Sequence, residues 1–97
     1  MITTTTRVTT APDVYAREFD GELVIVDLNG GEYFGLDQVG ARIWDLLVAG
    51  ASVEEAVTRI AATHDAPVER IRGDVVEITE KLVTHGLLRV VEGPVTL

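Results

Sequence analysis

Apolar and polar side chains alternate with a period of about two before position 37, and two short turn sequences interrupt the alternation. Asp20-Gly21 and Asn29-Gly30 are dipeptides that supply the positive φ angles of tight hairpins, so they are strong signals of strand pairing. A run that is apolar at almost every position lies between them, which is typical of a central strand. The pattern therefore predicts three successive antiparallel strands: Val14–Phe19, Glu22–Leu28 and Glu32–Leu36.

After Leu36 the apolar period changes to about 3.6 residues and stays there until Gly86, which predicts helices. The first helix begins at Asp37 as its N-cap and runs to about Val48, before Gly50. The second opens on the capping box Ser52–Glu55. The predicted buried side chains of the first helix are Val39, Ile43, Trp44 and Leu47, with Leu46 partly covered, and those of the second are Val53, Ala56, Val57, Ile60 and Ala61.

The third predicted helix is the longest, from about Pro67 to His85, with Asp65 as its candidate cap. A short strand over Leu87–Val91 follows, and Gly93-Pro94 ends it. This order predicts one α+β domain that is winged helix-turn-helix-like: a three-stranded antiparallel sheet, a three-helix bundle and a short C-terminal β segment. The domain spans 14–92, between a flexible lead-in over 1–13 and a C-terminal tail over 93–97.

Three features of this arrangement point beyond simple packing. A sheet of three strands leaves at least one edge open, which is either a liability or a docking site. Gly35 leaves the backbone of the third strand without a covering side chain. This marks either the close approach of another chain, or a bulge or the end of the strand. The third helix has a wide apolar arc, so it is either a central core helix or contacted on a second side. Its stripe is Val68, Ile71, Val75, Ile78 and Leu82, with a second line of Val76, Thr79 and Val83, bordered by Asp74, Glu77 and Lys81.

Composition restricts the possible chemistry. The chain has 97 residues, of which 46% are hydrophobic, enough for one modest core. It has no cysteine, which excludes disulfides, thiolate metal sites and cysteine nucleophiles. Its apolar runs reach only about five residues, far short of the roughly 20 that a membrane-spanning helix needs. We therefore expect a cytoplasmic protein without a membrane segment.

Charge restricts the possible partners. Sixteen acidic residues against eight basic ones give a formal net charge of −8. Lys81 is the single lysine, and the arginines are scattered from Arg7 to Arg89. Because affinity for nucleic acid and for anionic membranes comes from clustered cations, the composition disfavours both. A basic or apolar partner fits better.

The residues that commonly carry catalysis do not form a constellation. His64 and His85 are far apart in the sequence, each at the end of a predicted helix, and no third metal ligand is spaced to join them. Ser52 is the only serine and serves as a helix cap, so a Ser-His-Asp triad is disfavoured. The glycines at 30, 31 and 35 lack the context of a phosphate-binding loop. We expect no catalytic residue, no metal site and no cofactor, and therefore no enzyme.

Three stretches together resemble PqqD-type peptide chaperones, also called precursor-peptide recognition elements. They are residues 20–27 (DGELVIVD), 31–37 (GEYFGLD) and 40–47 (GARIWDLL). The likeness continues through the capping box and the stretch 74–88, so that it covers about 19–91. A stand-alone acidic chain of this length most resembles the leader-binding proteins of lasso-peptide biosynthesis.

The resemblance implies a function and a site. A precursor leader peptide would add as an antiparallel strand to the third strand and lie in a groove beside the third helix. The protein, as a monomer, would present this leader to a leader peptidase and an ATP-dependent macrolactam cyclase. The implied peptide-binding residues are Glu32, Tyr33, Phe34, Gly35, Leu36, Ile71, Asp74, Val75, Ile78, Lys81 and Leu82.

Two other functions remain open at this point. The element order is shared with winged-helix DNA-binding transcriptional regulators, although the third helix carries Glu69, Asp74, Glu77 and Glu80 against Arg70, Arg72 and Lys81. The chain could also be a subunit of an enzyme that works only in complex, with the sheet edge as its interface.

Overall fold

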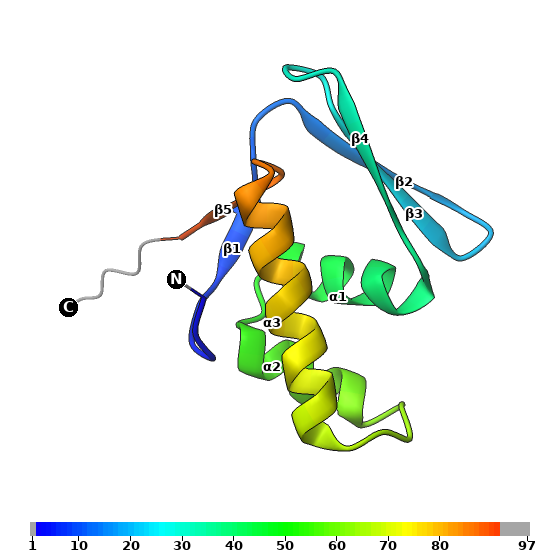
Figure 1. Cartoon of the computed structure of the whole chain (residues 1–97), viewed down its shortest axis with the longest axis vertical. Helices are drawn as coiled ribbons and strands as arrows, with labels where there is room; N and C mark the ends of the chain where they lie inside the picture. Colours follow the sequence, from blue (N-terminus) through cyan, green and yellow to red (C-terminus); the bar gives the residue numbers. More distant parts are fainter. Residues whose placement is uncertain (1, 92–97) are drawn as a thin grey trace.

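The computed structural model describes residues 2–91, which form two small antiparallel sheets and three helices (Figure 1). None of the helices in this part of the chain combines the length and the apolar composition needed to span a membrane. The elements in order are β1 (Val8–Thr10), β2 (Val14–Phe19), β3 (Glu22–Asp27), β4 (Glu32–Leu36), α1 (Gln38–Val48), α2 (Val53–Ala61), α3 (Val68–Thr84) and β5 (Leu88–Val90).

The predicted three-stranded sheet is present, with the order β2-β3-β4. The first hairpin turns at Asp20 and Gly21, whose φ angles are 53° and 84°, as its sequence predicts. The second hairpin differs from the predicted tight Asn29-Gly30 turn. Asp27 faces Glu32, so the loop spans 28–31 and the positive φ of 71° falls on Gly31. The Asp27 carboxylate accepts the Asn29 backbone N–H at 3.0 Å, which stabilises this wider loop.

Helix α1 begins directly after β4 and covers the inner face of the sheet, where Leu23 and Ile25 are buried. The Asp37 carboxylate accepts the Gly40 backbone N–H at 2.9 Å, which confirms the predicted cap. A Cβ on Gly40 would lie 3.0 Å from the Leu36 Cβ, closer than two carbons normally approach. Glycine at this position therefore lets the helix turn tightly under the end of the strand.

The N-terminal segment contains a strand that the sequence analysis missed. β1 pairs with β5, and Val8 is only 4% exposed, so a flexible lead-in over 1–13 does not fit these residues. The carbonyls of Thr4 and Thr6 accept the first backbone N–H groups of α2 at 2.9 and 3.0 Å. The β-branched threonines favour extended structure, but their partner β5 lies at the other end of the chain, where local patterning cannot indicate it. The predicted element order therefore lacks this first strand, and the predicted tail over 93–97 lies outside the described residues.

The α+β class is confirmed, and the winged helix-turn-helix label stays a prediction. The capping box of α2 is confirmed by two hydrogen bonds between Ser52 and Glu55, of 2.8 and 3.2 Å. The predicted Asp65 cap is wrong, because α3 begins after Pro67 without a side-chain cap.

Helix α3 buries a slightly different stripe from the predicted one. Ile71, Val75 and Leu82 are buried as expected, but Val68 is 44% exposed and Ile78 is half-buried. Thr79 takes a central position in the core, where its hydroxyl donates to the Val75 carbonyl at 2.7 Å. That local hydrogen bond satisfies the buried hydroxyl, so the polar residue packs like a valine.

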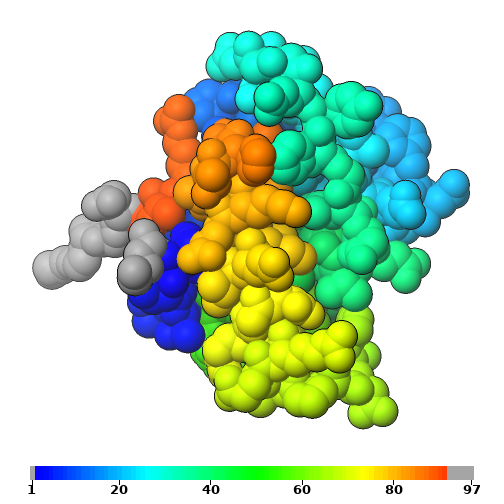
Figure 2. Space-filling model, in the orientation of Figure 1, coloured from blue at the N-terminus to red at the C-terminus, as the bar shows by residue number. Residues whose placement is uncertain are grey.

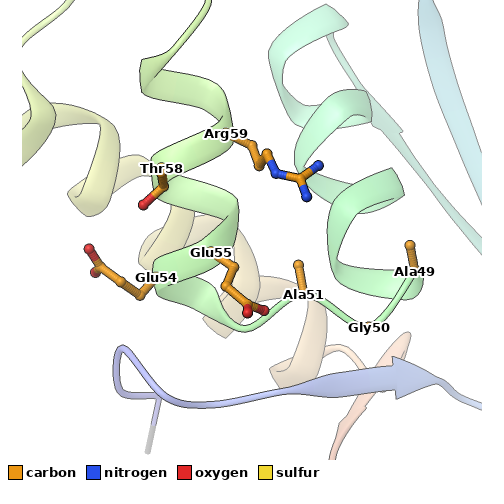
Figure 3. A pocket seen from close by; sticks show the side chains of 7 residues that line it. All are labelled: Ala49, Gly50, Ala51, Glu54, Glu55, Thr58 and Arg59. Atoms are coloured by element: carbon orange, nitrogen blue, oxygen red, sulfur yellow. The ribbon is translucent and has the colours of Figure 1, made fainter.

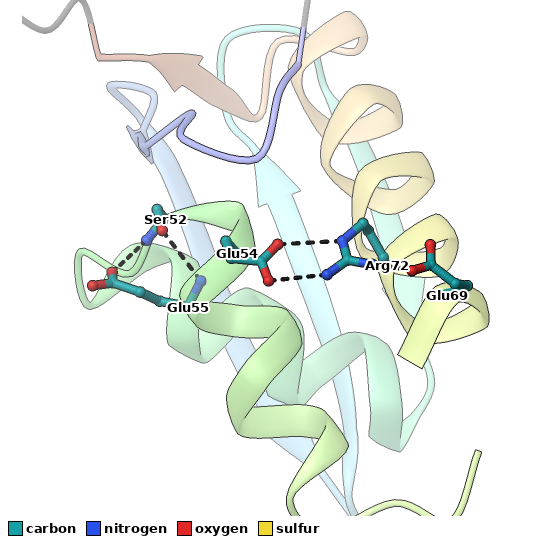
Figure 4. A network of polar contacts seen from close by, with 5 residues as sticks. All are labelled: Ser52, Glu54, Glu55, Glu69 and Arg72. Carbon is teal, nitrogen blue, oxygen red and sulfur yellow. Dashed lines mark hydrogen bonds and ion pairs between the residues drawn. The ribbon is translucent and has the colours of Figure 1, made fainter. Parts of the chain in front are cut away.

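A network of ion pairs centred on Arg72 holds α3 against α2 (Figure 4). The Arg72 guanidinium donates two hydrogen bonds to Glu54, at 3.0 and 3.2 Å, and a third to Glu69 at 2.8 Å. The hydrogen bond from Arg72 lowers the pKa of the Glu54 carboxyl, and the Ser52 backbone N–H together with Arg7 lowers the pKa of Glu55. Both glutamates therefore favour the folded state in their ionised form.

We expect Val8→Ala to lower the free energy of unfolding by about 2 kcal/mol, because it removes two buried methyl groups from the core. Thr9→Ala is the matched control, since Thr9 is the exposed neighbour in the same strand. Urea unfolding followed by circular dichroism measures both. Equal stability of the two variants would mean that β1 is not part of the cooperative fold.

We expect the contribution of Glu54 to stability to disappear in acid. Its folded pKa lies below the ordinary value of 4.5, so the contribution is complete above that pH and is lost as the pH falls through the lowered folded pKa. Glu54→Gln should therefore lower Tm near neutral pH, and its difference from the native chain should shrink below pH 4.5. Thermal melts across this range test it, with Glu69→Gln as the control that leaves the pair between Arg72 and Glu54 intact. A constant difference at all pH values would contradict it.

Candidate functional site

The open edge of β4 lies on the side of the sheet towards helix α3, and we call the surface between these two elements the β4–α3 groove. Within residues 2–91 no strand pairs with the outer edge of β4. The Phe34 ring of β4 packs edge-on against the ring of His85, the C-cap of α3, with centroids 4.5 Å apart. Figure 2 shows α3, in yellow and orange, running along the surface beside the green and cyan elements. The groove thus has a backbone edge on one side and a helix on the other.

A hollow of about 330 Å³ adjoins the N-terminal half of α3, where this helix meets α1. Its floor is apolar and buried, formed by Ile43, Ile60 and Val75, while His64, Arg70 and Asp74 are exposed at its rim. Val39, Ala66 and Ile71 complete the lining. Of the nine residues that line this hollow, the sequence analysis assigned three to the binding site: Ile71, Asp74 and Val75. Of the other lining residues, Val39 and Ile43 belong to α1, Ile60 to α2 and Arg70 to α3, while His64 and Ala66 lie in the loop between α2 and α3. No local sequence signal brings these elements together.

The strand residues of the predicted site divide between two faces. Phe34 and Leu36 are half-buried and face the core, whereas the Tyr33 side chain is 75% exposed on the opposite face. Gly35 pairs in register with Val24, and the strand continues to Leu36, so the alternative of a bulge or a strand end is wrong. Glu32 is exposed at the start of the strand. Because β4 is an edge strand, the backbone N–H and C=O groups of alternate residues point away from β3.

The helix residues of the predicted site also divide. Val75 and Leu82 lie in the core, and Ile71 is nearly covered. Asp74 and Lys81 are exposed, and Ile78 is half-buried. The side chains of α3 that a ligand could reach are therefore fewer than the sequence indicates, with Ile78 as the accessible apolar member. His85 was missed, although its contact with Phe34 joins the two walls of the groove.

A second hollow, of about 410 Å³, lies away from the groove at the turn between α1 and α2 (Figure 3). Both of its carboxylates already have partners: Glu55 pairs with Arg7 at 3.2 Å, and Glu54 pairs with Arg72. Apart from Thr58 and Arg59, the rest of its lining is Ala49, Gly50 and Ala51. These small residues offer little to hold a ligand, and we do not assign a site there.

No cluster of three or more His, Cys, Asp or Glu side chains suited to a metal occurs within the described part of the chain. The two histidines sit apart, His64 at the rim of the hollow and His85 against Phe34. The chemistry that the groove itself offers is non-covalent: backbone hydrogen bonds from a strand edge and apolar contacts from a helix.

Comparison with known proteins gives a consistent result. Residues 22–88 match the family model of coenzyme PQQ synthesis protein D (PqqD). A solved structure of TbiB1 in complex with the TbiA(beta) leader peptide is 34% identical, with a TM-score of 0.78, and the alignment covers 91% of this chain and 99% of TbiB1. The comparison with curated proteins gave no match.

Two further structures share the fold. A lasso peptide synthetase B1 complexed with its leader peptide is 20% identical, with a TM-score of 0.79 over 84% of this chain and 96% of that one. The heterocyclase TruD is 17% identical, with a TM-score of 0.62 over 94% of this chain but only 12% of its own. The family match covers most of the chain and the likeness to TbiB1 covers nearly all of it, so the chain belongs to the PqqD family.

Proposed function

We propose that this protein binds the leader segment of a ribosomally made precursor peptide, in lasso-peptide biosynthesis, without catalysing a reaction itself. The observation that carries the proposal is the open β4 edge beside α3, in a chain 34% identical to a protein solved with a leader peptide. An open strand edge beside an apolar wall is the geometry used for recognition by strand addition.

The leader adds to β4 as a fourth antiparallel strand. Backbone hydrogen bonds to Glu32–Leu36 depend little on the leader's sequence, so they supply affinity rather than selectivity. Selectivity comes from side chains that pack between Ile78 and Leu36 and enter the hollow beside α1. Each buried apolar anchor contributes roughly 1.5–3 kcal/mol, enough with the strand pairing for a dissociation constant of about 1 μM or tighter.

The bound leader is then presented to a leader peptidase and an ATP-dependent macrolactam cyclase. In this proposal the protein is a cytoplasmic monomer. It needs no metal or cofactor, because hydrogen bonds and packing in the groove are sufficient to hold a peptide. This division of labour suits a small chain with one groove.

DNA binding is the weaker candidate. Helix α3 would be the recognition helix, but Glu69, Glu77 and Glu80 are exposed on it, and Arg72 is already held by Glu54 and Glu69. Together with the net charge of −8, this disfavours the replacement of counterions along a phosphate backbone.

A titration with the synthetic leader of the precursor encoded beside this gene tests the binding mode. We expect the amide signals of Glu32–Leu36 and of α3 to shift in NMR spectra. Ile78→Glu should weaken binding at least about 30-fold, because it replaces an apolar contact by a charge. Val68→Glu is the matched control, since Val68 is an exposed apolar residue of the same helix outside the lining of the hollow.

Gly35→Pro should also weaken leader binding, because proline removes a backbone N–H from the edge strand. Circular dichroism confirms that each variant is folded. Amide shifts confined to α2 and the second hollow, with β4 unaffected, would refute strand addition.

We expect no mobility shift of duplex DNA at micromolar protein and physiological salt, since the net charge is −8 and the basic residues are scattered along the chain. The measurement is a gel-shift titration at low and physiological salt. A salt-dependent shift that Arg70→Ala removes would instead support the DNA-binding regulator.

A further inference from the structure

The two histidines have similar places in the sequence pattern, each near the C-terminal end of a helix, but their rings have different surroundings. The Nδ1 atom of His64 lies 3.3 Å from the Ile60 carbonyl oxygen, four residues earlier, and 3.2 Å from the Thr63 hydroxyl. The His85 ring instead packs edge-on against Phe34, with ring centroids 4.5 Å apart and ring planes inclined at 61°. One histidine thus has polar contacts to its own helix end, whereas the other contacts a strand distant in the sequence.

The C-terminal end of α3 is closed by backbone groups and does not require the imidazole of His85. The Gly86 N–H donates to the Val83 carbonyl at 3.0 Å, and the Leu87 N–H donates to the Leu82 carbonyl at 2.9 Å. With a φ of 78° at Gly86, this is the usual glycine-based end of a helix. Leu87 is buried, so the backbone on both sides of His85 is held in place. The imidazole therefore extends from a fixed backbone towards a contact outside the helix.

The inner side of β4 is contacted by two helices. Leu36, at the end of the strand, lies against the first turn of α1 near Gly40. Phe34, two residues earlier, is half-buried against the core, and its ring meets the ring of His85. The contact with His85 therefore adds a second point at which the inner side of β4 is held, in the middle of the strand.

The place of His85 on α3 connects it with the proposed leader site. Asp74, Ile78, Lys81 and His85 are spaced by four, three and four residues, so they lie on one face of the helix. Asp74 is at the rim of the hollow, and Ile78 is the accessible apolar residue of the site. The face of α3 that a leader would contact thus ends at the residue that touches Phe34.

A free strand edge binds a peptide more tightly when it is already ordered, because ordering it on binding costs free energy. β4 is paired on one side only, and Gly35 in its middle has no side chain that could hold the strand. Packing against Phe34 fixes the residue directly before this glycine. An edge-on aromatic pair changes an equilibrium constant by about two- to tenfold. That is the size of effect expected of a residue that orders β4 without touching the leader.

We propose that His85 is a positioning residue for leader binding. Its ring holds Phe34, and Phe34 keeps the free edge of β4 in the orientation that pairs with the leader. The proposal rests on the leader-binding function and adds to it a residue that does not itself contact the leader. A ring that had to move aside to admit the leader would have the opposite effect, so the direction of the change in affinity separates positioning from gating.

The test uses the full chain and the labelled synthetic leader of the precursor encoded beside this gene. His85→Ala removes the ring, His85→Phe keeps an aromatic ring, and Phe34→Leu is made alone and combined with His85→Ala. Thr84→Ala is the matched control, because Thr84 is the exposed neighbour in the same helix and lines a separate hollow with Ile2 and Val90. Fluorescence anisotropy measures leader affinity, thermal melts confirm folding, and amide hydrogen exchange followed by NMR measures the order of β4 without leader.

We expect His85→Ala to bind the leader about three- to tenfold more weakly, and its β4 amides to exchange faster than those of the native chain. His85→Phe should match the native chain in both measurements, because the edge-on ring contact is kept, and so should Thr84→Ala. In the Phe34→Leu background, His85→Ala should cause no further loss, because the ring then has no aromatic partner.

Unchanged leader affinity of His85→Ala would overturn the proposal, and tighter binding would identify the ring as a gate instead. An equal further loss in the Phe34→Leu background would mean that His85 contacts the leader directly, which also contradicts positioning. A native chain that does not bind the leader would refute the proposed function itself. The exchange rates of β4 would then still show whether His85 orders this strand, so the two failures are distinguishable.

Discussion

The tight junction between β4 and α1 is the constraint on which the site depends. Asp37 caps the helix directly after the strand, and Gly40 lets the first turn pass within contact distance of Leu36. A longer connection would let α1 swing away from the sheet or cover the free edge of β4. Because the junction is short, the helix turns beneath the inner face and leaves the strand edge open. The groove is thus a by-product of where one helix is allowed to begin.

The opposite wall depends on contacts between residues distant in sequence. Helix α3 is held to α2 by the Arg72 network and by the buried stripe around Val75 and Thr79. Towards β4, the ring of His85, the C-cap of α3, packs edge-on against the Phe34 ring. The apolar arc of α3 is wide although only part of it is buried, and under the proposed function the leader strand would cover the exposed part.

Local signals in the sequence predict most of the fold and part of the site. Strand boundaries, the first hairpin and two of the three helix caps follow from period and turn chemistry, because each depends on neighbouring residues. The pairing of β1 with β5 could not be predicted, since it joins the two ends of the chain through backbone bonds that leave no sequence pattern. The predicted lining of the hollow was incomplete for the same reason, because Val39 and His64 come close to α3 through tertiary packing. The split of Tyr33 and Phe34 between two faces was predictable, because strand periodicity alone decides it.

The β1–β5 sheet has a consequence for how this fold is distributed among larger proteins. It places the first and last strands of the domain side by side, opposite β4 in Figure 1. The paired strands β1 and β5 lie away from the free edge of β4. The domain can therefore be joined to another polypeptide as a complete unit. TruD, in which a matching fold makes up 12% of the chain, is consistent with such modular use.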